Sequence, residues 1–159
     1  MSDDGYVFDT SGLLDGWSRQ YPVDVFPDLW DSLSDLIEDG RGQSPEEVLA
    51  EAKKRDDGLH NWMKVRKAEL IYPTDMGLMQ EVKLILAEHK LITKPGTGRN
   101  AADPFVITLA AISGRAVVTG EQGGSTSKPK IPSVCAAWGV ECINFLEFIR
   151  REGWTFRRT

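Results

Sequence analysis

The sequence predicts one α/β domain built on a parallel sheet. Its 159 residues are about the length of a single domain, and 41% hydrophobic with 27% charged residues is the composition of an ordinary globular protein. Short apolar runs typical of buried strands alternate with amphipathic stretches typical of helices. This alternation favours parallel strands, because each return across the sheet passes through a helix. Ligands bind such sheets at the carboxyl ends of the strands, so a functional site is expected at that edge.

Composition also excludes several classes of protein. No stretch approaches the roughly 20 apolar residues that span a membrane, and the acidic start lacks the pattern of a signal peptide, so we expect a cytoplasmic protein without a membrane partner. The net charge of −5 argues against an indiscriminate polyanion binder. Cys135 and Cys142 are too few for a disulfide framework, and their spacing fits no common zinc site. Both are expected to be buried apolar groups.

The first predicted strand is the apolar triplet at residues 6–8. It ends at Asp9, which Thr10, Ser11 and Gly12 follow. In an open α/β sheet, Asp9 then stands at the ligand-binding edge. Asp, Ser and Thr are also N-cap residues, and a helix could begin near Gly12. The residues alone therefore fit two roles for Asp9, that of a helix cap and that of a catalytic group.

Two helices are predicted next. Apolar residues at helical spacing lie between Asp28, near the helix start, and Gly40, just past its end. A second helix is expected to begin at Ser44 as N-cap, with Pro45 at the first helical position. Glu47 falls three residues after the cap and completes a capping box. Amphipathic spacing predicts further helices over 59–70 and 78–89.

The last acid-bearing segments follow a glycine-rich loop at 93–100, which lacks the spacing of a phosphate-binding P-loop. Asp103 is predicted to cap a buried helix whose first turn holds Pro104. The apolar run at 116–119 predicts a buried strand, and Glu121 stands just past its end.

Carboxylates thus stand at two predicted strand ends and two predicted helix starts. They are Asp9, Glu47 with Glu51, Asp103 and Glu121. Their placement on a parallel sheet with one functional edge suggests convergence on a divalent cation. Mg²⁺ and Mn²⁺ take carboxylate oxygens as ligands and can activate a water against a phosphate. Phosphodiester hydrolysis is therefore the leading chemistry.

The order of these segments resembles the PIN domain, a nuclease fold with a central parallel sheet and helices on both sides. The resemblance is carried by Val7-Phe8-Asp9-Thr10-Ser11, the glutamate-bearing helix within 45–52, and segments 102–110 and 117–121. It extends from about Gly5 to Phe156, and a bacterial subfamily of stand-alone PIN-like proteins is similar also at 21–30, 131–135, 139–144 and 151–154. It implies a three-layer α/β/α sandwich with a central, mostly parallel sheet, formed by one domain over 1–159.

The resemblance implies a Mg²⁺- or Mn²⁺-dependent endoribonuclease, often the toxin of a toxin–antitoxin pair (VapC-like). The implied partners are RNA and a cognate antitoxin protein, and a homodimer stays open. Carried over by position, the metal ligands are Asp9, Glu51, Asp103 and Glu121, with Glu47 as the alternative one helical turn before Glu51. The candidates for substrate binding are Thr10, Ser11, Thr119 and Arg99.

Two features leave alternatives open. Glu121 stands where the family commonly has Asp, so one or two metals could bind.

Segments 1–4 and 120–130 are expected to be flexible, and the tail at 150–159 interleaves four arginines with two aromatic residues. Such a tail suits RNA binding by stacking, an antitoxin-binding surface, or simple packing of its aromatic rings on the core.

Other function classes fit the sequence less well. A haloacid-dehalogenase phosphatase needs a second Asp where Ser11 stands, and dinucleotide binding needs more glycine after the first strand. The remaining alternative is a PIN-like fold retained as an inactive protein-interaction module. Every proposed acidic position still bears a carboxylate, which favours activity.

Overall fold

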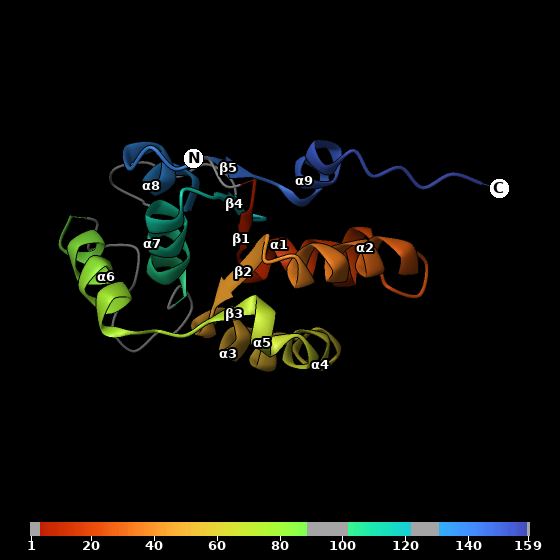
Figure 1. The fold of residues 1–159 in the computed structure, drawn as a ribbon, viewed down its shortest axis with the longest axis horizontal. Coiled ribbons are helices and arrows are strands. Elements are labelled where there is room, and N and C mark those ends of the chain that lie inside the picture. Colours follow the sequence, from red (N-terminus) through yellow and green to blue (C-terminus); the bar gives the residue numbers. More distant parts are fainter. Residues whose placement is uncertain (1–3, 89–101, 122–130, 159) are drawn as a thin grey trace.

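The computed structural model describes residues 4–88, 102–121 and 131–158, and it has the predicted α/β architecture. Within these residues, five strands form one parallel sheet in the order β3-β2-β1-β4-β5. The strands are β1 (Tyr6–Phe8), β2 (Gly42–Pro45), β3 (Ile71–Tyr72), β4 (Ala116–Val118) and β5 (Cys142–Ile143). In Figure 1, α6, α7 and α8 lie on one side of the sheet and α1, α2 and α9 on the other, so the predicted three-layer α/β/α sandwich is confirmed.

The helices connect these strands in the order that the sequence predicts for parallel pairing. They are α1 (Thr10–Leu14), the π-helix η1 (Asp15–Gln20), α2 (Pro27–Glu38), α3 (Glu46–Arg55), α4 (Asp57–Val65), α5 (Lys67–Leu70), α6 (Met76–Glu88), α7 (Asp103–Ser113), α8 (Ile131–Ala137) and α9 (Phe145–Glu152). The expected helix over 59–70 is divided into α4 and α5 at Arg66, which has a non-helical φ of −101°. The predictions for 1–3, 93–100 and 122–130 lie outside the described residues.

The central strand β1 brings the amino-terminal segment into the middle of the core. All three of its residues are buried, as their apolar character predicts. Phe8 pairs in register with Val118, so the carboxyl ends of β1 and β4 lie side by side. Gly12 lets α1 approach this pair, because a Cβ there would lie only 2.5 Å from the carbonyl oxygen of Val118. The close approach places the first turn of α1 against the end of β4.

The predicted capping box at the start of α3 is wrong. Ser44 belongs to β2, and its Oγ donates a buried hydrogen bond of 2.7 Å to the carbonyl oxygen of Phe8. Pro45 occupies the N-cap position, and α3 begins at Glu46. The Glu47 carboxylate accepts hydrogen bonds from Thr74 instead of returning to the helix start. Parallel pairing of β2 with both β1 and β3 explains the difference, because it uses Ser44 as a strand residue.

The carboxyl-terminal segment is partly helix and partly extended chain. Residues 150–152, predicted as the beginning of a tail, close α9, and Gly153 ends the helix with a φ of 70°. The Trp154 ring packs edge-on against Phe148 with centroids 5.2 Å apart, whereas Phe156 is exposed. Of the two aromatic rings in the tail, that of Trp154 therefore packs on the core and that of Phe156 does not.

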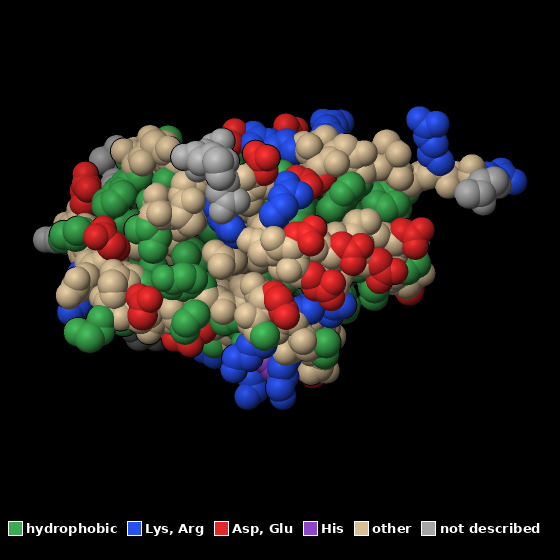
Figure 2. All heavy atoms as spheres, in the orientation of Figure 1, with side chains coloured by type: hydrophobic (Ala, Val, Ile, Leu, Met, Phe, Trp, Pro, Cys, Tyr) green, Lys and Arg blue, Asp and Glu red, His purple; other side chains and the backbone are tan. Residues whose placement is uncertain are grey.

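Charge is distributed unevenly over the surface. Figure 2 shows acidic side chains gathered over α2, whose exposed acids are Asp28, Asp31, Asp35 and Glu38. Four of the 24 acidic residues therefore lie on the exposed face of one helix. In the described part of the chain, none of the helices combines the length and the apolar character needed to cross a membrane.

Candidate metal centre

A small acidic cavity of about 150 Å³ opens at the carboxyl edge of the sheet. Its lining consists of Asp9, Thr10, Ser11, Glu51, Arg55, Asp103 and Glu121. The acids come from the end of β1, from α3, from the first residue of α7 and from the residue that follows the end of β4 by three positions. Four carboxylates that are far apart in the sequence therefore share one cavity, as the strand-end and helix-start pattern predicts.

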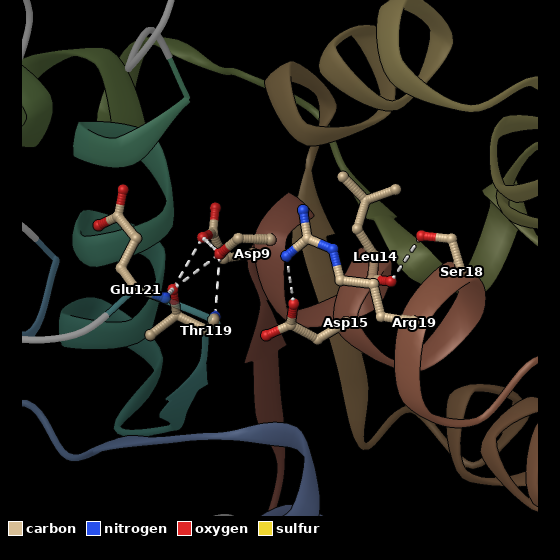
Figure 3. A network of polar contacts seen from close by, with 9 residues as sticks. Asp9, Leu14, Asp15, Ser18, Arg19, Thr119 and Glu121 are labelled. Atoms are coloured by element: carbon tan, nitrogen blue, oxygen red, sulfur yellow. Dashed lines mark hydrogen bonds and ion pairs between the residues drawn. The ribbon is translucent and has the colours of Figure 1, made fainter.

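Asp9 is buried, with 3% of its surface exposed. Its Oδ2 accepts hydrogen bonds from Ser11 Oγ at 2.6 Å and from Thr119 Oγ1 at 2.9 Å (Figure 3). Burial raises the pKa of Asp9, and these two hydrogen bonds act in the opposite direction because they favour the charged form. Asp9 occupies the N-cap position of α1, but its side chain makes no capping hydrogen bond. The carboxylate lines the cavity, and the backbone N–H groups of Thr10 and Ser11 at the start of α1 also favour its charged form.

Glu51 and Glu47 have different surroundings although they lie on one helix. Glu51 lines the cavity, and its Oε2 accepts a hydrogen bond of 2.8 Å from Thr10 Oγ1. Burial raises the pKa of Glu51, the hydrogen bond from Thr10 opposes this rise, and the charge of Asp9 adds to it. Glu47 is absent from the lining and accepts hydrogen bonds of 2.9 and 2.7 Å from Thr74 Oγ1. The geometry therefore favours Glu51 as the helical acid of the site.

Asp103 has a strongly perturbed carboxylate. It is the first residue of α7 and not the predicted N-cap, a position that Ala102 holds. Burial raises the pKa of Asp103 to about 9, assisted by the negative charges of Asp9, Glu121 and Glu51. The group is therefore largely protonated at neutral pH when no cation is present. A bound cation would reverse this preference, because it stabilises the charged carboxylate.

Glu121 stands at the mouth of the cavity beside β4. Its backbone N–H donates to Thr119 Oγ1 at 3.1 Å, and its Oε2 accepts a hydrogen bond of 2.9 Å from the backbone N–H of Ile131 at the start of α8. The neighbouring Gly120 N–H donates to Ser11 Oγ at 2.9 Å. These contacts join the loop after β4 to both α1 and α8.

The hydroxyl groups predicted to bind substrate are engaged with the acids. Thr10 donates to Glu51, whereas Ser11 and Thr119 donate to Asp9. In this structure these hydroxyls therefore orient the carboxylates. Arg99, the fourth candidate for substrate binding, lies outside the described residues.

Two arginines near the cavity were not among the predicted site residues. Arg55 lines the cavity, and its positive charge lowers the pKa of Glu51. It follows Glu51 by four residues, so a helical-face argument could have found it. Arg19 lies outside the cavity lining and donates a hydrogen bond of 2.7 Å to Asp15 within η1 (Figure 3), and Asp15 lies against Gly120, which precedes Glu121. No sequence pattern indicates the π-helix that places this pair.

The donor set of the cavity fits a hard divalent cation. Carboxylate oxygens are the ligands that Mg²⁺ and Mn²⁺ prefer. Burial and the negative charges of three neighbouring carboxylates raise the pKa of Asp103, and a cation would balance those charges. Among the described residues, no three Asp, Glu, His or Cys side chains are already placed to ligate one ion. Cation binding therefore requires side-chain rearrangement. The long side chains of Glu51 and Glu121 can turn toward a cation if they leave their present hydrogen bonds with Thr10 and with the Ile131 N–H.

The fold and the site together define an α/β protein with an acidic cavity at the carboxyl edge of a parallel sheet. Residues 6–156 match the family described as "Domain of unknown function (DUF4411)". The match covers nearly the whole chain, so the protein belongs to this family. A comparison with curated proteins gave no match.

Proposed function

We propose that the protein is a PIN-like endoribonuclease that depends on Mg²⁺ or Mn²⁺ and hydrolyses RNA phosphodiesters. The observation that carries the proposal is the shared cavity of Asp9, Glu51, Asp103 and Glu121, in which burial and mutual repulsion raise the pKa of Asp103 to about 9. Perturbed carboxylates in a cavity at a sheet edge are typical of functional sites. The order of the sequence motifs, which resembles that of PIN nucleases, supports the same activity.

Different residues of the chain would have different roles in such a reaction. Asp9, Glu51, Asp103 and Glu121 would hold the cation, which when bound supplies charge stabilisation at the scissile phosphate and an acidified water. Ser11 and Thr119 fix the orientation of Asp9, and Thr10 that of Glu51. Arg55 places a guanidinium at the cavity, where it can pair with a phosphate oxygen.

The test is cleavage of labelled single-stranded RNA by purified protein, with Mn²⁺, with Mg²⁺ and with EDTA. Cleavage is expected only with a divalent cation and is expected to be lost in Asp103→Asn, which also controls for contaminating nucleases. The same rate of cleavage in EDTA, or in the variant, would contradict the proposal.

A second candidate function is a protein-interaction module without turnover. It is favoured by the absence, among residues the structure describes, of three acidic, His or Cys side chains ready to ligate a metal. A protein that binds neither Mn²⁺ nor Mg²⁺ and cleaves no RNA would support this candidate over the nuclease.

We extend the nuclease proposal to a toxin of a toxin–antitoxin pair that acts on cytoplasmic RNA. The support is the sequence resemblance to VapC-like proteins. Expression of the chain alone is expected to arrest growth, and co-expression with the product of the adjacent gene to relieve the arrest. Asp103→Asn is the matched control, and arrest by this variant would contradict toxicity through RNA cleavage.

A further inference from the structure

A larger groove of about 660 Å³ adjoins the acidic cavity, and Glu121 lines both. One wall comes from the end of η1 and the residue after it, and another from β5 and the start of α9. The loop after β4 forms the side next to the cavity. A chain that enters the cavity with one phosphate therefore has space for its neighbouring nucleotide in this groove.

A fixed aromatic ring forms part of the first wall. Tyr21 lines the groove and stacks on Phe145, with ring centroids 5.9 Å apart and planes 29° from parallel. Phe26 contacts the Tyr21 ring edge-on at 5.4 Å, and Trp30 Nε1–H donates to the Tyr21 carbonyl at 2.7 Å. One face of the ring is covered by Phe145 and Tyr21 as a whole is half-buried, so the face turned away from Phe145 is the one that a base would use. A partly exposed, immobilised ring is a surface on which a nucleobase can stack.

A hydrogen-bond donor faces the groove from the other wall. Asn144 is exposed and lines the groove, and its Oδ1 accepts a hydrogen bond of 2.8 Å from the Glu147 N–H as the N-cap of α9. This contact fixes the amide group. No described residue accepts a hydrogen bond from the amide nitrogen, so its two N–H groups can bind a ligand.

The charge of the groove selects the part of a nucleotide that fits. Asp15 and Glu121 line it, and no Lys or Arg of the described residues does. A phosphate there would meet the carboxylate of Glu121 and that of Asp15, which is already paired with Arg19, whereas an uncharged base experiences no such repulsion. The cation that suits a phosphate, Arg55, lies instead in the adjoining cavity.

We propose that this groove is a subsite for the base of the nucleotide next to the cleaved phosphate, with Tyr21 as stacking surface and Asn144 as hydrogen-bond donor. The inference rests on the proposed RNA-cleaving function. It makes Tyr21 and Asn144 determinants of RNA affinity and base preference, distinct from the acids that hold the cation.

The first test is independent of catalysis. Binding of the four nucleoside 5′-monophosphates and of ribose 5-phosphate to the wild-type protein in EDTA is measured by saturation-transfer NMR. Nucleotides are expected to bind through their bases, and ribose 5-phosphate is not expected to bind. Cys142 also lines the groove while Cys135 is buried, so bound nucleotide should slow alkylation of Cys142 by iodoacetamide. Equal binding of ribose 5-phosphate, or no nucleotide binding, would overturn the subsite.

Matched variants assign the contacts. Asn144→Ser keeps an N-cap oxygen for α9 but removes the amide donor, and it is expected to weaken nucleotide binding about fivefold. Tyr21→Leu is expected to weaken it about tenfold through loss of stacking, whereas Tyr21→Phe keeps the ring and the affinity. Unchanged affinity in folded Asn144→Ser would remove Asn144 from the site.

The second test separates this inference from the proposed function. For RNA cleavage, Asn144→Ser and Tyr21→Leu are expected to raise KM or change base preference while Mn²⁺ affinity stays as in the wild type. Cleavage with unaltered KM and preference in both variants would overturn the subsite and leave the nuclease standing. Nucleotide binding without any cleavage would overturn the nuclease and leave a nucleotide-binding groove.

Discussion

Thr119 donates a hydrogen bond of 2.9 Å to the carboxylate of Asp9, although 110 residues separate them in the sequence. The two residues follow the adjacent parallel strands β4 and β1, whose ends are level because Phe8 pairs with Val118. The orientation of Asp9 is therefore fixed by the sheet itself. Both partners are buried, so the contact is also protected from water.

Removing either buried acid should abolish cleavage and spare the fold. Asp9→Asn and Asp103→Asn are expected to lower metal-dependent RNA cleavage at least a hundredfold, an order typical of lost catalytic groups. Thermal stability at neutral pH without metal should hold or rise. Asp9→Asn replaces a buried acid of a crowded acidic cavity by a neutral amide, and Asp103→Asn replaces an acid that is already largely protonated. Cleavage assays and calorimetry on the same samples test this, and wild-type activity in either variant would refute the assigned site.

The two glutamates of α3 provide a matched pair. Glu51→Gln is expected to lose Mn²⁺ affinity and cleavage, because Glu51 lines the cavity. Glu47→Gln is expected to keep both and to lose about 1 kcal/mol or less of stability, since only its contact with Thr74 is weakened. Calorimetric titration and thermal melts measure the two effects. Loss of Mn²⁺ binding in Glu47→Gln alone would place the ligand one helical turn earlier.

Cation binding should stabilise the folded state. If the four acids bind Mn²⁺ or Mg²⁺ only when folded, a hundredfold excess over Kd adds about 2.7 kcal/mol to the free energy of unfolding. The melting temperature is therefore expected to rise with Mn²⁺ and to return to its metal-free value on addition of EDTA. A melting temperature that is insensitive to millimolar Mn²⁺ would count against the metal centre.

Stability without metal should fall as pH rises. The pKa of Asp103 is about 9 in the folded protein and near the ordinary value of 3.8 when unfolded, so between these values the folded state binds more protons. The stabilising proton is fully present below pH 3.8 and is lost as pH rises through 9. Melting temperatures in EDTA from pH 5 to 9 should show this decline, and Asp103→Asn should flatten it. An equal slope in the variant would show that another group is responsible.

A cluster at the amino ends of the strands serves as a stability control. Glu152 accepts hydrogen bonds from Tyr6 at 2.6 Å and from both terminal nitrogens of Arg41 at 2.7 Å. Glu152→Ala is expected to lower the free energy of unfolding by about 1 kcal/mol, because it removes the hydrogen bonds to Tyr6 and Arg41 while Arg41, a third exposed, keeps water and the Asp4 carbonyl oxygen as partners. Mn²⁺ affinity should not change, because the cavity lies at the opposite ends of the strands. A large loss of metal affinity would contradict this separation.

The acids at element boundaries could be predicted because their signals are local. An apolar triplet that stops at Asp9 and an Asp-Pro pair before a buried apolar run each mark the boundary of an element. Both acids lie in the predicted cavity. Strand β2 escaped prediction because Gly42-Gln43-Ser44-Pro45 has no apolar alternation and gains its structure only from two neighbouring strands.

Contacts between distant segments account for what the sequence could not decide. Glu47 and Glu51 share a helix face, so helical spacing alone does not distinguish them. Their contacts do, because Glu47 binds Thr74 and Glu51 binds Thr10. A capping box is a local pattern. At Ser44 it does not form, because the hydroxyl group donates to the carbonyl oxygen of Phe8 on the neighbouring strand instead. Side-chain placement of this kind depends on tertiary packing, which local patterns do not encode.

The central position of β1 bears on how the protein is made. Ribosomes produce β1 first, yet its neighbour β4 and the acid Glu121 arrive only after residue 115. A nascent or prematurely ended chain shorter than 121 residues lacks at least one of the four carboxylates and, with them, the complete cavity. Translation interrupted before residue 121 therefore releases fragments without the complete acidic centre, which can form only after Glu121 has been added.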